Sequence, residues 1–152
     1  MERTPTADTL GGKVRDIRHI IIHCADTPPQ MDIGVAEIRE WHLARKFTDV
    51  GYHYVIRRSG EVEKGRQEDQ IGAHVQGHNH DSIGICLVGG MNTSKTGPDC
   101  NFTQHQWSAL KALVAGLTVA YPQAKVSGHR DHTVAKTCPN FDAISWWYGK
   151  RG

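Results

Sequence analysis

The chain has 152 residues, of which 38% are hydrophobic, and its formal net charge at pH 7 is +2. This length suits one compact domain with its own hydrophobic core. The near-neutral charge creates no strong field that would favour nucleic acid or an acidic membrane surface, and no apolar run is long enough to cross a bilayer. We therefore expect one globular domain, acting as a monomer, that binds neither nucleic acid nor membranes.

The beginning of the chain is polar. Thr, Pro, Asp, Gly and Lys dominate residues 1–16, which predicts a flexible arm before a folded domain over residues 17–152. Whether this arm binds a second protein is left open by the sequence. Residues 1–12 lack the apolar stretch of a signal peptide, so we expect the protein to remain in the cytoplasm. Cysteines there are thiols or metal ligands rather than disulfides.

The first predicted element is a buried strand. Residues 18–24 form a short, β-branched apolar run of the kind found in such strands. A turn with two prolines ends it, and residues 35–47 then follow the spacing of an amphipathic helix, for which Asp32 is the expected N-cap. The inward face of this helix is predicted to consist of Val35, Ile38, Trp41 and Leu43 or Arg45.

The middle of the chain predicts a hairpin, a loop and a second buried strand. Residues 52–58 and 61–64 flank Ser59-Gly60, which is typical of a hairpin turn. Residues 65–81 are rich in Gly, His and Asn without periodicity, which predicts a long loop. Residues 82–88 form another apolar run, and two glycines end it.

The last third predicts a long helix followed by shorter elements. Thr103 opens the helix and Gln106 completes a capping box. Residues 125–127 then predict a strand, residues 128–142 a polar loop and residues 143–148 a short terminal helix. Strands and helices mix along the chain, so the expected fold class is α/β or α+β, with a single central mixed sheet flanked by helices.

Three residues indicate a metal site. A catalytic zinc ion binds three protein ligands, preferably neutral imidazole or thiolate, and leaves a fourth position for water. His23 lies near the end of the first buried strand, and His129 and Cys138 lie in the late polar loop. His132, in the same loop, is a rival to His129 that spacing does not exclude. The alternative is that the loop histidines are solvated and Cys138 is a buried thiol.

The other three cysteines are not expected to bind this metal. Cys24 follows His23 directly, and neighbouring residues on a strand point to opposite faces, so Cys24 is expected in the core. Cys86 lies on a buried strand, where packing explains it. Cys100 lies in a loop of Gly, Pro and Asp and is expected to be an exposed thiol without a role.

Tyr52 and Lys136 are candidates for the chemistry beside such a metal. A phenol near a metal-bound water can hold or deprotonate that water, and Tyr52 begins a predicted strand. Lys136 stands two residues before Cys138, so in extended backbone the two side chains face the same way and the cation can stabilise an oxyanion. The alternatives are an ordinary strand residue and a solvated loop cation.

One motif is misleading. His78-Asn79-His80 spells the letters of an HNH nuclease, but in those nucleases the three residues are spread along a ββα-metal unit instead of being adjacent. The chain also lacks the basic stripe that a nuclease needs to bind nucleic acid. We therefore reject the nuclease interpretation.

These segments resemble those of one family, the type-2 N-acetylmuramoyl-L-alanine amidases, which include peptidoglycan recognition-type domains and the small lysozymes of tailed phages. The similarity runs in order over residues 17–147. The matching segments are IHCADT (22–27), GVAEIREWH (34–42), DVGYHY (49–54), HNHDSIGICLVGG (78–90), NFT (101–103) and KTCPNFD (136–142).

The resemblance implies a zinc-dependent phage enzyme with a mixed sheet. Such an enzyme hydrolyses the amide bond between the lactyl group of N-acetylmuramic acid and L-alanine in peptidoglycan, and it waits in the host cytoplasm until lysis. The implied site residues are His23, His129 and Cys138 as zinc ligands, Tyr52 and Lys136 as catalytic assistants, and His74 as a pocket residue that touches substrate. The alternative is a non-catalytic peptidoglycan-binding module, but such members typically lack the cysteine ligand.

Overall fold

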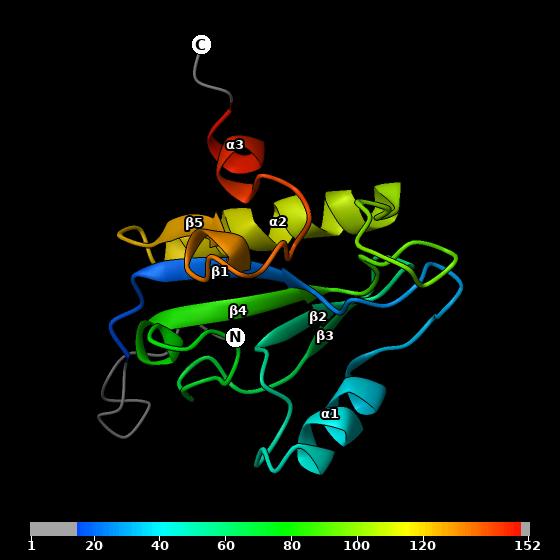
Figure 1. Cartoon of the computed structure of the whole chain (residues 1–152). Coiled ribbons are helices and arrows are strands. Elements are labelled where there is room, and N and C mark those ends of the chain that lie inside the picture. Colours follow the sequence, from blue (N-terminus) through cyan, green and yellow to red (C-terminus); the bar gives the residue numbers. More distant parts are fainter. Residues whose placement is uncertain (1–14, 150–152) are drawn as a thin grey trace.

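A five-stranded mixed sheet forms the centre of the protein in the computed structural model, which describes residues 15–149 (Figure 1). The strands are β1 (His19–Cys24), β2 (Tyr54–Ile56), β3 (Val62–Lys64), β4 (Ser82–Leu87) and β5 (Lys125–Gly128). Their order is β3-β2-β4-β1-β5, and only the β2–β3 hairpin is antiparallel. The predicted class, a single mixed sheet flanked by helices, is confirmed. Of the predicted arm, residues 1–14 lie outside the described part of the chain.

Helices cover both faces of the sheet. The helices are α1 (Val35–Ala44), α2 (Gln104–Ala120) and α3 (Ala143–Tyr148), and two single 3-10 turns are η1 (Asn79–Asp81) and η2 (His129–Asp131). Figure 1 shows α2 and α3 on one face and α1 on the other. Within residues 15–149, no helix combines the length and the apolar character that a membrane span requires.

Alternation along β1 divides its side chains between the two faces. Ile20, Ile22 and Cys24 enter the larger core, which α2 and α3 cover. His19 and His23 therefore face the side of α1. A smaller apolar cluster beneath α1 contains Val55 of β2 and Cys86 of β4 but no residue of β1, so loops, rather than a helix, cover β1 on this face.

The N-terminus of α1 differs from the prediction. The N-cap is Gly34, not Asp32. The Glu37 carboxylate accepts a hydrogen bond from the Gly34 N–H at 2.9 Å, and the Glu63 carboxylate accepts one from the Val35 N–H at 2.8 Å. These two acceptors supply what an N-cap side chain would otherwise provide, and Asp32 is free to lie beside Arg57.

The end of α1 and its inward face also differ from the prediction. The helix ends at Ala44 instead of residue 47, because Lys46 adopts a φ of +73°, which a right-handed helix does not allow. Ile38 and His42 are its buried residues. Trp41 and Leu43, predicted to face inward, are 40% and 47% exposed.

The predicted capping box of α2 is confirmed and has a second role. Thr103 Oγ1 accepts a hydrogen bond from the Gln106 N–H, and Gln106 Oε1 accepts one from the Thr103 N–H, each at 3.0 Å. The Gln106 amide also donates to the carbonyl oxygens of Ile56 and Val88. Because Gln106 is fully buried, its side chain fixes α2 to the ends of β2 and β4.

Candidate metal centre

The sheet register brings two histidines together. His23 lies near the carboxyl end of β1, is 1% exposed and faces the side of α1. In the parallel pairing of β1 and β5, Ile22 lies opposite Gly128, the last residue of β5. The next residue in the chain is a histidine in both cases, His23 near the end of β1 and His129 at the start of η2. The ring centroids of His23 and His129 are 4.7 Å apart.

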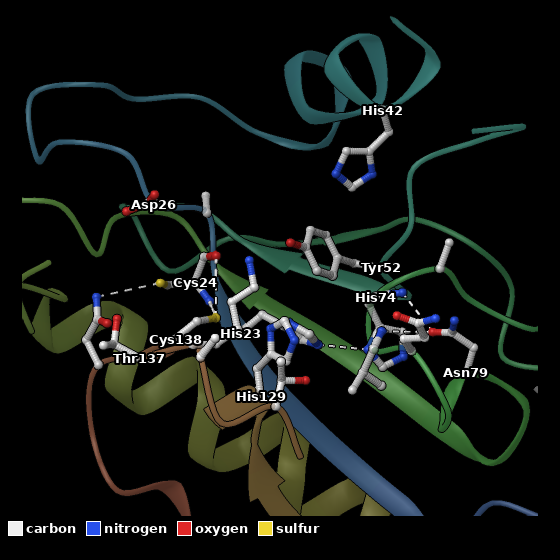
Figure 2. A pocket seen from close by; sticks show the side chains of 18 of the residues that line it. His23, Cys24, Asp26, His42, Tyr52, His74, Asn79, His129, Thr137 and Cys138 are labelled. Carbon is white, nitrogen blue, oxygen red and sulfur yellow. Dashed lines mark hydrogen bonds between the residues drawn. The ribbon is translucent and has the colours of Figure 1, made fainter. Parts of the chain in front are cut away.

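The loop after η2 returns to the same point and brings Cys138 to these two histidines. The Arg130 N–H donates a hydrogen bond to the Cys138 carbonyl oxygen at 2.8 Å, which closes the loop. The ligand atoms of His23, His129 and Cys138 all lie within 4.8 Å of one another. Figure 2 shows the three side chains pointing toward a common point, with Tyr52 and His74 beside them.

The donor set suits zinc. Two imidazoles and one thiolate are ligands that this metal prefers, and three protein ligands leave a position for water or substrate. The Cys24 N–H donates a hydrogen bond to Cys138 Sγ at 3.1 Å, which fixes the position of the sulfur.

His132 does not join this cluster. Its Nε2 lies 2.8 Å from the Ser127 hydroxyl, and its ring packs against His19 and His78. The fold thus separates two loop histidines that are three residues apart, and His129 is the one brought to His23 and Cys138.

A chain of hydrogen bonds orients the His23 ring. His23 Nε2 lies 2.8 Å from His74 Nδ1, and His74 Nε2 lies 3.0 Å from the Ser82 hydroxyl. In the tautomer in which His23 Nε2–H donates to His74, Nδ1 of His23 is left for a metal. Such a partner on the second ring nitrogen is the usual companion of a metal-binding histidine.

Both candidate imidazole ligands favour the neutral form that binds metal. Burial lowers the pKa of His23 well below its usual value, and the nearby His74 and His129 add to this effect. Burial also lowers the pKa of His129, with a further contribution from the positive charge of Lys136. Lys136 itself is exposed.

Tyr52 lies beside the centre as a neutral phenol. Its ring centroid is 5.1 Å from that of His23. Burial raises the pKa of Tyr52 well above its usual value, and negative charge on Cys86 and Cys138 raises it further. In the metal-free protein the hydroxyl therefore remains protonated at neutral pH.

A cleft of about 760 Å³ opens over this cluster, and Lys136, Tyr52 and His74 line it with the three candidate ligands. Volumes of this size are typical of ligand sites.

His42, at the end of α1, was not predicted from the sequence as a site residue. It forms part of one wall of the cleft and accepts a hydrogen bond from the Gly51 N–H at 2.8 Å. Its position one helical turn after Ile38 could have predicted that His42 faces inward with Ile38.

The remaining cysteines are found as expected. Cys24 belongs to the large core, Cys86 is fully buried and Cys100 is exposed. The Cys138 side chain, followed by burial, raises the pKa of the Cys24 thiol. A protonated thiol is a poor metal ligand, so Cys24 is a weak competitor for the metal despite its position next to His23.

Comparison with known proteins adds to this geometry. Residues 13–141 match the family model described as N-acetylmuramoyl-L-alanine amidase. The endolysin of Klebsiella phage KP32 is 46% identical over 135 residues, which are 89% of this chain and 88% of that protein. The endolysin of Escherichia phage T7 is 46% identical over 129 residues, with 84% and 83% covered. The N-acetylmuramoyl-L-alanine amidase LysC from Clostridium intestinale has a similar structure, with a TM-score of 0.72, 27% identity and coverage of 82% and 77%.

We predict that acid destabilises the metal-free protein through its buried histidines. Burial lowers the pKa of His23 and His74, and that of His53 to about 4, whereas an unfolded histidine has a pKa of about 6.5. Below pH 6.5 the unfolded chain binds protons that the native state does not. The free energy of unfolding should therefore fall between about pH 6.5 and pH 4, by about 1.4 kcal/mol per pH unit for each such imidazole.

Urea unfolding of chelator-treated protein at a series of pH values measures this slope. The control is His105→Ala, which removes an exposed imidazole and should leave the slope unchanged. A free energy of unfolding that stays constant from pH 7 to pH 5 would contradict the burial of these neutral histidines.

Proposed function

Because this chain belongs to the N-acetylmuramoyl-L-alanine amidase family, we propose that it hydrolyses the bond between the lactyl group of N-acetylmuramic acid and L-alanine in peptidoglycan with a zinc cofactor. The observation that carries the proposal is the convergence of His23, His129 and Cys138 on one point of the cleft. Among its relatives are phage endolysins, which supports a role in degrading the host cell wall at lysis.

We assign the metal-holding role to these three side chains. A bound zinc ion would act as a Lewis acid toward the scissile carbonyl oxygen and lower the pKa of a water molecule. The protein supports such an ion in two ways. His74 and Ser82 hold the His23 ring through their hydrogen-bonded chain, and the Cys24 N–H holds the Cys138 sulfur in place through a hydrogen bond.

His74 is proposed to act mainly by orienting His23. It is 9% exposed and lines the cleft, so a substrate can reach only its edge. Both of its ring nitrogens already have partners in the chain, namely His23 and Ser82. Contact with substrate is thus the smaller part of its proposed role.

Tyr52 and Lys136 are proposed to act on the reacting atoms. The Tyr52 phenol, protonated at neutral pH, can donate a hydrogen bond to the oxygen of the attacking water. It can also pass a proton to the leaving nitrogen of L-alanine. Lys136 presents a cation at the rim of the cleft, where it can stabilise the negative charge that develops on the carbonyl oxygen.

The alternative is a module that binds peptidoglycan without cutting it. Such a module needs the cleft but not a metal with an open position. The three-ligand cluster, with Cys138 in contact with the backbone of Cys24, supports the catalytic proposal over this one.

The cut site provides the direct test. Digestion of purified peptidoglycan should release new amino groups on L-alanine and leave the glycan strands intact, because the scissile bond is an amide. Mass analysis of the soluble fragments and an assay of reducing sugar ends measure both products. New reducing ends without new amino groups would indicate a glycosidase instead, and no fragments at all would favour the binding module.

Substitution of the two assistants should separate chemistry from binding. Tyr52→Phe keeps the ring and removes one hydroxyl, while Lys136→Ala removes an exposed cation. We expect kcat to fall by ~10²–10⁴ for Tyr52→Phe and on the order of 10²–10³ for Lys136→Ala. Both variants should keep their zinc content and still sediment with insoluble peptidoglycan.

Lys111→Ala is the matched control, because Lys111 is an exposed lysine on α2, across the sheet from the cleft. It should turn over at the wild-type rate. If Tyr52→Phe remained within a few-fold of the wild type, the phenol would be only a wall of the cleft, and another group would have to carry the proton.

A further inference from the structure

A second group of metal-binding side chains lies apart from the cleft. His19 begins β1, His78 precedes η1 and Asp81 ends it. One ligand atom from each lies within 4.8 Å of the others. None of the three lines the cleft, and none takes part in the proposed amide hydrolysis.

His132 adds a third imidazole to this group. Its ring centroid is 4.7 Å from that of His78 and 5.3 Å from that of His19. The Ser127 hydroxyl holds His132 Nε2 at 2.8 Å, so Nδ1 is left for another partner. The group therefore offers three imidazoles and one carboxylate, which we call the second histidine cluster.

Two atoms of the second histidine cluster are buried without a normal partner. His78 Nδ1 and Asp81 Oδ1 have no hydrogen bond within the described part of the chain, and they lie 3.4 Å apart. Buried polar atoms without partners are costly. Two ligands of a tetrahedral zinc ion with bonds of about 2.1 Å lie about 3.4 Å apart, so this spacing suits a shared cation.

Two imidazoles of the second histidine cluster, those of His19 and His132, favour the neutral form. Burial is the main cause that lowers the pKa of both His19 and His132, and the charges of the neighbouring histidines add to it. Asp81 acts in the opposite direction on His19. Three rings in contact cannot all carry a proton without repulsion, whereas a bound cation would use their lone pairs.

The second histidine cluster is spatially distinct from the candidate catalytic centre. His19 and His23 are on the same face of β1, four residues apart, which corresponds to about 13 Å along a strand. The donor atoms are nitrogen and oxygen only, without a thiolate. Imidazole and carboxylate together favour zinc, nickel or copper over magnesium or calcium, which bind through oxygen ligands.

We propose that His19, His78 and Asp81 form a second binding site for a divalent transition metal of the zinc type, with the His132 ring packed beside it. Its effect follows from where the ligands originate. The metal ties the beginning of β1 to the loop that contains η1, and the His132 ring, from the loop that contains His129, packs against this site. It thereby stabilises the loop that contains η1, beside the cleft.

Existing contacts already hold part of this region. The Arg15 guanidinium donates hydrogen bonds to the carbonyl oxygens of Asn79 and Ser82, and the Asn79 side chain accepts hydrogen bonds from the N–H groups of His74 and Val75. A metal at the second histidine cluster would thus reinforce a loop that also carries His74. The proposal does not depend on the proposed amidase activity, because its test measures metal binding.

Zinc titration of chelator-treated full-length protein tests the second site. The wild type should bind two equivalents. Asp81→Asn keeps the size of the side chain and removes its charge, and His78→Ala removes one imidazole. Each should weaken the second equivalent at least about tenfold and leave the first unchanged, which also shows that the variant is folded. His80→Ala is the matched control, since His80 is an exposed neighbour 3.8 Å from the other carboxylate oxygen of Asp81, and it should bind two equivalents.

Cobalt(II) distinguishes the two centres. Cobalt bound at the centre of Cys138 should show thiolate-to-metal charge-transfer absorption, and cobalt at the second histidine cluster should not. Cys138→Ser should therefore bind cobalt without that band, and its melting temperature should rise on binding. The proposal is overturned if the wild type binds only one equivalent, or if His78→Ala or Asp81→Asn binds the second equivalent as tightly as the wild type.

Discussion

The alternation of side chains along β1 sets the positions of both the large apolar core and the candidate metal centre. β1 is the central partner of two parallel strands, and its hydrogen bonds to β4 and β5 fix its register on both edges. A shift by one residue would exchange its two faces. Ile20 and Ile22 would then leave the core under α2, and His23 would enter it. The apolar core and the candidate metal centre therefore fix each other through one short strand.

Placing neutral histidines on a buried face has a physical cost that the surrounding structure offsets. An imidazole removed from water needs a partner on each nitrogen. The chain from His23 through His74 to Ser82 provides such partners and also sets the ring direction. A metal at the candidate centre would use the remaining lone pair. His78 Nδ1, by contrast, is buried without a hydrogen bond in the described part of the chain. A metal at the second histidine cluster would supply the missing partner.

The sequence predicted what depends on local pattern. The strand at residues 18–24, the capping box of α2 and the opposite directions of His23 and Cys24 all follow from local periodicity or spacing, and the structure agrees. The N-terminus of α1 was predicted wrongly because Glu63, 28 residues further along the chain, reaches back to it.

The choice between loop histidines could not be made from spacing. It depends on the β5 register and on the Ser127 hydroxyl, which holds His132 away from the centre. The second histidine cluster was invisible to sequence reasoning for a related reason. His19 and His78 belong to elements far apart in the chain, and only the fold brings their rings to 4.8 Å.

X-ray absorption spectroscopy of zinc-loaded His78→Ala protein identifies the ligands of the candidate catalytic centre, because this variant should hold zinc only there. We expect one sulfur ligand at about 2.3 Å and two imidazole nitrogens at about 2.0–2.1 Å, with the sulfur lost when Cys138→Ser is added. A spectrum with two sulfur ligands would mean that Cys24 joins Cys138 at the metal. A spectrum without sulfur in the presence of Cys138 would contradict the assignment of His23, His129 and Cys138 as the metal centre.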